Sequence, residues 1–419
     1  MGCRATVRLG DVVRLEDAKR EPISARQRAE RKGIYPYFGA QGIVDHLNDY
    51  TYEGEYLLVA EDGENLRSRK QPIANAASGR FRVNNHAHVL GGTEKCNLIY
   101  LLHLLNSTDI SGYVTGSTQP KLSQSNLLDI TVALPDIDTQ NAIASLLNSF
   151  DKKISLNNQL NGYLVELVNS EFAKRFDSHG PKTPLKNVLS ISTKSLNPQQ
   201  HVGEVWEHYS IPAFDATHWP TFELADGIKS NKYVVDNNSI LISKLNPSIK
   251  RMWVPACLTD KAVCSTEFIV YKPLESSHKS FYCAAINAEE FTAFLLEHVT
   301  GSTGSRQRTQ PKATHNYPMP NPSRIEIESF CAFADPIYQQ IQANEIESQR
   351  LRSLRDALLP KLMSGEIDVS KVDLTQLNSH LAQIRKLNDA PLATTDLGFR
   401  FDRSHYTPLL YNPSSSQQQ

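Results

Sequence analysis

The chain has 419 residues, of which 40% are hydrophobic and 21% charged, and its 44 lysines and arginines nearly balance its 45 aspartates and glutamates. This length exceeds what one hydrophobic core can serve and suits two or three domains. The formal net charge of −1 excludes an overall basic field that would attract nucleic acid, and no apolar run is long enough to span a membrane. The N-terminus has no secretory signal pattern, so we expect a cytoplasmic protein without a membrane partner.

The first segment, up to residue 134, mixes short β-rich runs such as Tyr56–Val59 with Gly-rich turns. Between Asn65 and Thr93 it contains no Asp or Glu. Because Arg can pair with guanine and Asn with adenine, this run is a candidate DNA-binding patch. The simpler alternative is a solvated surface. Its basic residues are Arg67, Arg69, Lys70, Arg80 and Arg82.

A turn rich in small and hydroxyl residues follows, as Gly116-Ser117-Thr118-Gln119-Pro120-Lys121. The same letters return later as Gly301-Ser302-Thr303 and, after a six-residue insertion, as Gln310-Pro311-Lys312. Such a motif is weak alone, but its recurrence before each of two helical segments indicates an internal repeat. The candidate DNA-binding residues of the first turn are Ser117, Gln119 and Lys121.

A helical arm from about Asp136 to Phe176 carries apolar residues in steps of three and four, and a second copy runs from about Ser323 to Ser364. Ile341 lies 187 residues after Ile154. Each stripe is too polar for a free-standing coiled coil, so each arm is expected to bury its seam against the other. The expected packing residues are Ile154, Leu164, Leu167, Ile341, Leu351, Leu354 and Leu358.

Between the arms lies a second segment, residues 181–320, which opens with Leu185 and Val188 as the first opens with Leu9 and Val12. No acidic residue occurs from Asn237 to Thr259, nor between His298 and Ile325. These runs are a second candidate DNA-binding patch, with the same alternative of a solvated surface. Their basic residues of interest are Lys244, Lys250, Arg251, Arg306, Arg308 and Lys312.

The second arm carries two start signals. Ser323 and Glu326 have the spacing of a capping box, and Asp335 followed by Pro336 is typical of an N-cap and first helical residue. We therefore expect each arm to be a short helix leading into a long one. Gly365 ends the second arm, and the polar residues 373–419 are expected to form a poorly ordered tail.

The six cysteines include no Cys-x-x-Cys pair, which argues against a disulfide framework and a zinc ribbon. Cys257, Cys264 and Cys283 with His278 form a conceivable ligand set. Buried free thiols are the better expectation, so we assign no metal site.

The order of module, arm, module and arm over about residues 8–372 resembles the specificity subunit of type I restriction-modification enzymes. The most distinctive run is Leu354–Glu366, which contains Leu359-Pro360-Lys361-Leu362. The first module matches through Leu9–Val12, Tyr35–Ala40, Leu57–Gly63 and Gly116–Leu122, and the second through Tyr209–Pro212, Ser239–Pro247 and Gly301–Arg306. The first arm lacks the Leu-Pro-Lys-Leu end and has Phe172–Arg175 instead.

This resemblance implies an α+β fold in which two α/β target recognition domains are separated by two long helices. The helices would pack as an antiparallel coiled coil, and the whole would be a pseudo-twofold internal repeat. The implied parts are recognition domains at 1–134 and 181–320, and spacer arms at 135–180 and 321–372.

In function, the resemblance implies that each recognition domain reads one half of a bipartite, asymmetric site in double-stranded DNA. The arms would dock two methyltransferase subunits and, through them, restriction subunits. The chain itself would be non-catalytic and hold no cofactor. S-adenosylmethionine, ATP and Mg²⁺ would belong to the partner subunits, which would flip and methylate an adenine at N6.

Three alternatives compete with this interpretation. A methyltransferase would need an Asn-Pro-Pro-Phe type of motif, but Asn246-Pro247 and Asn321-Pro322 are each followed by Ser. Asp136 with Asp151-Lys152-Lys153 matches a nuclease pattern, but these residues fall on a predicted helix instead of paired strands. A scaffold that binds no DNA is the third alternative.

Overall fold

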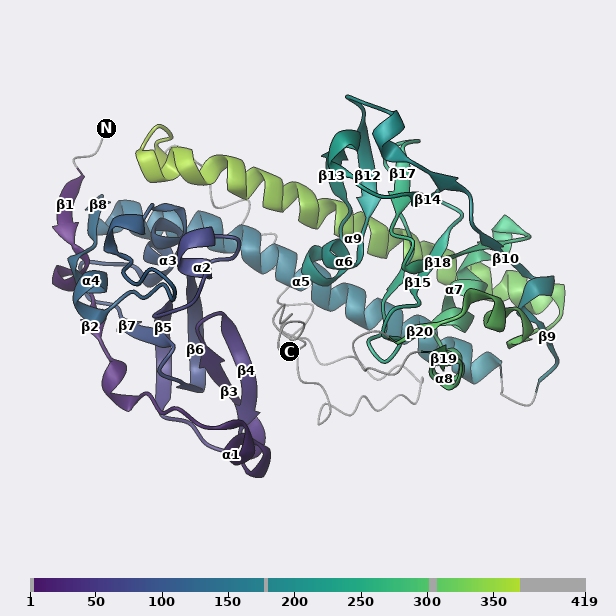
Figure 1. Cartoon of the computed structure of the whole chain (residues 1–419), viewed down its shortest axis with the longest axis horizontal. Coiled ribbons are helices and arrows are strands. Elements are labelled where there is room, and N and C mark those ends of the chain that lie inside the picture. Colours follow the sequence, from purple (N-terminus) through teal and green to yellow (C-terminus); the bar gives the residue numbers. More distant parts are fainter. Residues whose placement is uncertain (1–3, 177–179, 301–306, 370–419) are drawn as a thin grey trace, which may run out of the picture. The chain divides into compact units, whose positions relative to one another are not determined.

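The computed structural model describes residues 4–176, 180–300 and 307–369 (Figure 1). The chain divides into two compact units: unit 1 is Met1–Ile154 with Leu351–Gln419, and unit 2 is Ser155–Arg350. Among the described residues, no helix is long and apolar enough to cross a membrane. The expectations for Arg306 and for the tail at 373–419 lie outside the described residues.

A six-stranded sheet forms the centre of unit 1, in the order β2-β7-β5-β6-β3-β4. All neighbours are antiparallel except β3 and β6. Successive side chains of β5 point to opposite faces: Leu57 and Val59 join the core beneath the helices, and Leu58 packs with Phe81 on the other face. The strands are β2 (Arg14–Leu15), β3 (Lys32–Gly39), β4 (Gly42–Leu47), β5 (Tyr52–Ala60), β6 (Ala74–Val83) and β7 (Ala87–Gly91).

Short helices and a two-stranded ribbon complete unit 1. The Asn97 side chain caps α3 by accepting hydrogen bonds from the amides of Ile99 and Tyr100 at 2.9 and 3.0 Å. The elements are η1 (Leu9–Asp11), η2 (Asp17–Lys19), α1 (Ala25–Glu30), α2 (Asn65–Ser68), α3 (Leu98–Ser107), η3 (Ser111–Tyr113) and α4 (Gln124–Asp129), and the ribbon pairs β1 (Ala5–Arg8) with β8 (Thr131–Leu134).

Unit 2 contains a four-stranded sheet, β10-β18-β15-β16, and a five-stranded sheet, β11-β14-β17-β12-β13. Ile240 and Ile242 of β15 face a core with α7, while Leu241 faces a second core with Trp253. The strands are β9 (Lys182–Pro184), β10 (Leu189–Ser192), β11 (Ser195–Leu196), β12 (Val205–Tyr209), β13 (Thr221–Leu224), β14 (Lys232–Val234), β15 (Ile240–Ser243), β16 (Met252–Trp253), β17 (Ala262–Cys264), β18 (Phe268–Pro273), β19 (Val299–Thr300), β20 (Arg308–Thr309) and β21 (Pro318–Pro320). The helices are η4 (Leu185–Asn187), η5 (Pro198–Gln200), α6 (Ile211–Thr217), η6 (Ala225–Gly227), η7 (Ser276–His278), α7 (Lys279–Asn287), α8 (Glu289–Glu297) and η9 (Pro311–Asn316).

Each unit contains its own set of four strands, and the two sets have the same arrangement. The order β2-β7-β5-β6 in unit 1 matches β10-β18-β15-β16 in unit 2. The register agrees as well, because Leu57 pairs with Leu90 and Ala60 with Ala87, while Ile240 pairs with Tyr271 and Ser243 with Phe268. The strands added to these sets differ: unit 1 extends through β3 and β4, and unit 2 builds the separate five-stranded sheet. The sequence repeat therefore reflects one architecture with two different additions.

Both modules also begin in the same way, as the repeated Leu and Val predict. The Leu9 amide donates to the Ile130 carbonyl at 2.8 Å, and the Leu185 amide donates to the Tyr317 carbonyl at 2.9 Å. Leu9 and Leu185 are both fully buried.

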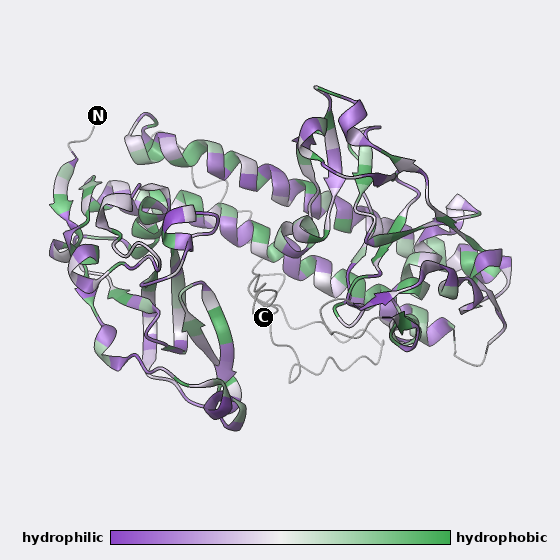
Figure 2. Cartoon of the chain, viewed as in Figure 1, coloured by the Kyte–Doolittle hydropathy of each residue, from purple (hydrophilic) through white to green (hydrophobic). Residues whose placement is uncertain are grey.

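Two long helices, α5 (Ile137–Arg175) and α9 (Arg324–Ser364), connect the modules. Within unit 2 they run antiparallel, since Asn157 contacts Ser348 and Asn161 contacts Ile341. Hydrophobic and hydrophilic residues alternate in bands along both helices (Figure 2). Gly365, with φ of +80°, follows the end of α9, as its position in the sequence predicts.

The expected division of each arm into a short and a long helix is wrong. Both helices are continuous, and Pro336 lies inside α9. Proline removes one amide donor from the helix. Its neighbours Ala334 and Ile337 pack into the core of unit 2, and this burial stabilises the helix on both sides of Pro336. The start signal that holds is the capping box: the Glu326 carboxylate accepts from the Ser323 amide at 2.8 Å, and the Ser323 hydroxyl accepts from the Glu326 amide at 3.4 Å.

The expected seam is correct in part. Ile154 and Ile341 are buried, and Leu351 and Leu358 pack against the core of unit 1. Leu164 is half-buried. Leu167 and Leu354 are 45% and 48% exposed, which corrects their assignment to the seam. Leu167 and Leu354 come one residue before the stripe positions Val168 and Arg355, so each lies about 100° away from the stripe around its helix.

Asparagines form a local twofold contact between α5 and α9 in unit 2. Asn157 donates to Ser348 Oγ at 3.2 Å, and Asn344 donates to Asn161 Oδ1 at 2.7 Å. Since Asn344 and Ser348 are the repeat equivalents of Asn157 and Asn161, the two bonds are symmetry copies. Asn157 also reaches the carbonyl of Asn344, its own equivalent, at 3.4 Å. The helix pair therefore has a local twofold symmetry at this contact within unit 2.

The described cysteines are free. Cys257 and Cys264 belong to one core cluster and Cys283 to another. Among the described residues, they form no metal-ligand group with His278.

Candidate nucleic-acid interface

The turn at Gly116 in unit 1 is closed by a backbone bridge. Thr115 and Lys121 exchange two hydrogen bonds of 2.8 Å, and the Thr115 hydroxyl donates to the Lys121 carbonyl at 3.2 Å. Gly116 has φ of +84°, and a Cβ there would lie 2.2 Å from the Gln119 carbonyl oxygen. Glycine is therefore required. Ser117 and Gln119 are exposed beyond the bridge.

Arg67 of α2 braces this turn. Its guanidinium donates to the carbonyl of Gly116 and, at 2.8 Å, to that of Ser117. A guanidinium has five N–H donors. Arg67 can therefore hold the turn and keep donors directed to solvent, where its side chain is exposed.

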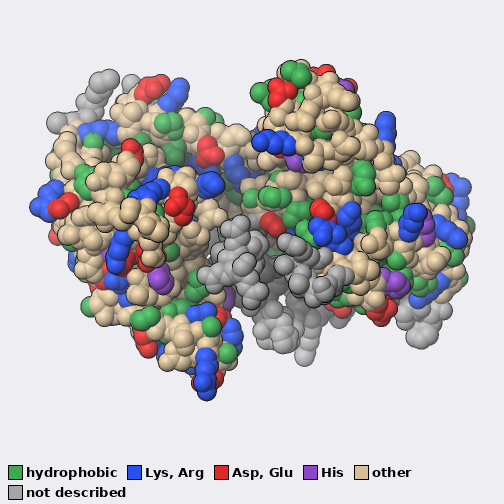
Figure 3. Space-filling view, viewed as in Figure 1, with side chains coloured by type: hydrophobic (Ala, Val, Ile, Leu, Met, Phe, Trp, Pro, Cys, Tyr) green, Lys and Arg blue, Asp and Glu red, His purple; other side chains and the backbone are tan. Residues whose placement is uncertain are grey.

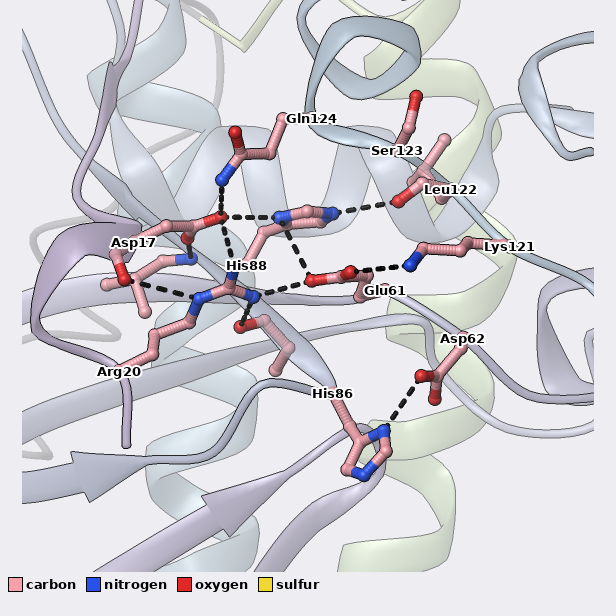
Figure 4. A network of polar contacts seen from close by, with 12 residues as sticks. Asp17, Arg20, Glu61, Asp62, His86, His88, Lys121, Leu122, Ser123 and Gln124 are labelled. Atoms are coloured by element: carbon pink, nitrogen blue, oxygen red, sulfur yellow. Dashed lines mark hydrogen bonds and ion pairs between the residues drawn. The ribbon is translucent and has the colours of Figure 1, made fainter. Parts of the chain in front are cut away.

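A buried polar network lies next to the turn (Figure 4). His88 is fully buried, with Nδ1 at 2.7 Å from Asp17 Oδ2 and Nε2 at 2.8 Å from the Leu122 carbonyl oxygen. Both ring nitrogens therefore lie within hydrogen-bond distance of an oxygen atom. Arg20 donates to Glu61 Oε2 at 2.6 Å. The network thus connects the segment after β2, the ends of the central strands β5 and β7, and the residue that follows the turn.

Both carboxylates of this network are held ionised. Burial alone would raise the pKa of Asp17, but its hydrogen bonds, led by that with His88, hold this pKa below the usual value. Burial would likewise raise the pKa of Glu61, but the hydrogen bond from Arg20 and the charge of His88 lower it.

The ligand atoms of Asp17, Glu61 and His88 lie within 4.8 Å of one another, as in a metal site. However, the Arg20 guanidinium already bridges the carboxylates, at 3.0 Å from Asp17 and 2.6 Å from Glu61. A cation of this chain therefore balances the acidic charge, and we assign no metal to this cluster.

Two arginines of the first acid-free run stabilise the fold. The Arg82 side chain is only 9% exposed and pairs with Glu21 and, at 2.8 Å, with Asp49. Arg69 has φ of 49° and donates to the carbonyls of Leu105, Asn106 and Thr108 at 2.9–3.0 Å, which satisfies the C-terminal end of α3. The structure thus corrects the expectation that these two arginines are available to DNA.

The other members of that run remain accessible. Arg80 is half-exposed, pairs with Glu53 at 2.9 Å and lies over the Tyr50 ring at 4.9 Å. Lys70 is exposed, and no ion pair is recorded for it among the described residues. The Lys121 side chain is 56% exposed and lies 3.2 Å from Glu61.

The basic residues of unit 2 divide in the same way. Arg251 is buried and forms two hydrogen bonds with Asp215 at 2.6 and 2.8 Å, so it too is structural and not available to DNA. Lys250 donates to the Asn287 carbonyl, and Arg308 donates to Glu267 at 3.0 and 3.1 Å. Lys244 is half-buried and Lys312 exposed.

Both units build the same strand–turn junction, defined as residues 61–63, 86 and 120–122 in unit 1 and 244–246, 267 and 307–309 in unit 2. In unit 1 the Leu122 amide donates to the Glu61 carbonyl at 2.8 Å, and the Gly63 amide to the Pro120 carbonyl at 3.1 Å. In unit 2 the Thr309 amide donates to Lys244 at 3.0 Å, and the Asn246 amide to Gln307 at 2.9 Å. A third bond joins Glu61 to His86 and Lys244 to Glu267, at 2.9 Å in each case.

This junction corrects the alignment of the two turns. Arg308, and not Lys312, is the counterpart of Lys121, because the Thr300 hydroxyl donates to the Arg308 carbonyl at 3.1 Å as Thr115 does to Lys121. In this alignment the segment from Thr300 to Arg308 is two residues longer than that from Thr115 to Lys121. The two turns therefore differ by two residues in length, and not by the six inferred from the sequence. The second Gln-Pro-Lys leads instead into η9.

Two residues that build this site, Asp17 and His88, were not singled out from the sequence. They lie far apart in the chain and carry no motif, so only the fold brings them together. A usable signal was their position at the ends of apolar runs, where polar side chains terminate strands. On the face shown in Figure 3, Lys and Arg side chains form separate groups interleaved with Asp and Glu.

Residues 4–164 match the family described as the type I restriction modification DNA specificity domain. A Haemophilus influenzae protein named as a type I restriction enzyme specificity subunit is 33% identical over 141 residues, covering 34% of this chain and 36% of that protein. The specificity subunit of the EcoprrI enzyme of Escherichia coli is 30% identical over 149 residues, covering 34% and 35%. These alignments span about a third of each relative's length.

A solved structure extends the likeness to the fold. The S subunit of a type I restriction-modification system from M. genitalium superimposes with a TM-score of 0.56 at 15% identity, covering 86% of this chain and 96% of that one. Residues 4–164 therefore match the type I restriction modification DNA specificity domain, and the fold of the chain is similar to that of a type I S subunit.

Proposed function

We propose that this chain is the DNA-specificity subunit of a type I restriction-modification complex and reads a bipartite, asymmetric site. The observation that carries the proposal is the strand–turn junction, which recurs in both units around different side chains. Two domains with the same backbone arrangement but different side chains can place those side chains against two half-sites of different sequence. On this proposal the two recognition domains are residues 1–134 and 181–320, and the helical arms set their spacing.

The chain would act without chemistry of its own. Two methyltransferase subunits would bind along the helical arms and hold S-adenosylmethionine, and restriction subunits would join through them with ATP and Mg²⁺. The accessible basic residues, among them Arg67, Lys70, Lys121, Lys244 and Lys312, would contact DNA phosphates and bases. The buried Arg82 and Arg251 and the partly buried Arg69 would keep each recognition domain rigid.

The test uses the chain in complex with its methyltransferase partner. Sequencing of methylated adenines in DNA exposed to the complex should show one motif, made of two different short halves with a constant gap. Binding of duplex DNA should weaken steeply as salt rises, because phosphate contacts release counterions.

A complex whose affinity for DNA does not depend on salt would support the scaffold alternative and reject the proposal. A palindromic or uninterrupted motif would contradict two unlike recognition domains.

A further inference from the structure

The strand–turn junctions of the two units have the same backbone hydrogen bonds but side chains of opposite net charge. Four side chains surround each one: Glu61, Asp62, His86 and Lys121 in unit 1, and Lys244, Leu245, Glu267 and Arg308 in unit 2. With histidine neutral, the first set carries a formal charge of −1 and the second +1. Local electrostatics should therefore differ between the units even though the backbone bonds agree.

The backbone equivalence extends to unusual conformations. Gly63 has φ of +109°, and its counterpart Asn246 has φ of 47°. Asn is one of the few residues other than glycine that adopts this region readily. The isolated bridges agree as well, since Asp62 pairs with Lys121 and Leu245 with Arg308. Position 244 in unit 2 is therefore the structural counterpart of position 61 in unit 1.

The side chains at these two positions have different surroundings. Glu61 is neutralised by Arg20 at 2.6 Å and by Lys121 at 3.2 Å. In unit 2 the cation of the turn, Arg308, pairs with Glu267 and leaves Lys244 without that partner. No side-chain hydrogen bond or ion pair is recorded for Lys244 among the described residues.

The Lys244 side chain thus carries a charge that no carboxylate of the junction pairs with, and a ligand phosphate could form a charge-assisted hydrogen bond with it. The other cations of the first acid-free run in unit 2 are engaged, Lys250 with a carbonyl and Arg251 with Asp215. Lys244 is thus the cation that the junction of unit 2 leaves for an anion.

We propose that Lys244 is a phosphate-contacting residue of the second recognition domain and that the matching position of the first, Glu61, makes no such contact. This inference rests on the proposed DNA-reading function. As a point charge on a flexible stem, Lys244 would add affinity with little sequence discrimination. The two domains would therefore contribute unequally to the salt dependence of binding.

The experiment compares the wild-type complex with its Lys244→Ala, Lys244→Arg and Lys186→Ala variants. Lys186 is an exposed lysine of η4, at the opposite end of the same sheet because β10 and β18 are antiparallel. Affinity for a duplex carrying the methylated site is measured at several salt concentrations. Lys244→Ala should make the slope of log affinity against log salt shallower by about one, and Lys244→Arg should keep the wild-type slope. The methylated motif should not change, and Lys186→Ala should match wild type.

An unchanged slope for Lys244→Ala would overturn the assignment, as would a changed motif with an unchanged slope. These results differ from failure of the proposed function itself, in which the wild-type complex would show no salt-dependent binding. Assembly with the methyltransferase and an unchanged melting temperature confirm that each variant is folded.

Discussion

At the scale of single residues, acid-free runs of sequence contain two kinds of arginine. Arg69, Arg82 and Arg251 form hydrogen bonds or ion pairs with carbonyls or carboxylates of the same unit. Arg67 also binds carbonyls, those of the turn at Gly116, but its side chain remains exposed to solvent. The sequence alone does not distinguish them, because an arginine and its partner lie 33 to 61 residues apart. Accessibility, and not local charge, therefore decides which of them can meet DNA.

The first prediction concerns Gly116. Replacing it by Ala forces a Cβ to within 2.2 Å of the Gln119 carbonyl and strains a backbone with φ of +84°. The strain of about 1–3 kcal/mol should open the turn and weaken DNA binding by roughly 5- to 150-fold at one half-site. Gly112→Ala is the matched control, because nothing lies within 4 Å of a Cβ there. Equal affinities of the two variants in a binding titration would show that the turn does not approach DNA.

The second prediction concerns pH and Asp17. Its folded pKa is lowered, so its contribution to stability is present above the unfolded value of about 3.9 and is lost as pH falls through the folded value. Asp17→Asn should lower the melting temperature at pH 7 by several degrees and flatten its decline below about pH 4. Asp11→Asn removes the same charge from an exposed site and should keep the wild-type profile. Parallel profiles for wild type and Asp17→Asn in scanning calorimetry would contradict the role of the His88 network.

At the scale of elements, the helix pair combines an apolar seam with a buried polar contact. Apolar packing alone tolerates a shift along the helices, because leucines and isoleucines meet in many registers. The asparagine contact of Asn157 and Asn344 fits one register only, since each amide bonds to a particular partner. If the arms set the gap between half-sites, this contact fixes the gap.

The third prediction tests that contact by a double-mutant cycle. Asn161→Leu and Asn344→Leu should each destabilise unit 2, because each leaves the amide of the other asparagine without its partner on the facing helix. The double variant should be less destabilised than the sum, with a coupling of about 0.5–3 kcal/mol, because both unpaired groups are then removed. Thermal unfolding of the four proteins provides the cycle, and Asn158→Leu on the exposed face of α5 is the control. Additive effects would mean that the amides do not act as a pair.

At the scale of the whole chain, the sequence predicted the features that local signals encode, but not the contacts between residues far apart in the chain. Helical periodicity, the capping box at Ser323 and the paired openings at Leu9 and Leu185 are local signals, and the structure confirms them. Matching of the letters Gln-Pro-Lys failed, because the equivalence of Lys121 with Arg308 is fixed by hydrogen bonds and not by residue identity. The network of His88 could not be predicted, because its members come together only when the sheet forms.

The last prediction follows from that corrected equivalence. If each unit reads one half-site through its turn, Lys121→Gln and Arg308→Gln should weaken binding at different halves of the site. Each loss should be about 1–3 kcal/mol, or roughly 5- to 150-fold. Duplexes with one half or the other scrambled separate the effects: a variant should show no extra loss on the duplex that lacks its own half. Arg26→Gln, at a side chain that is 93% exposed on α1, provides a charge-matched control. Losses by both variants on the same half-site would contradict the equivalence of the junctions and, with it, the division of recognition between the two units.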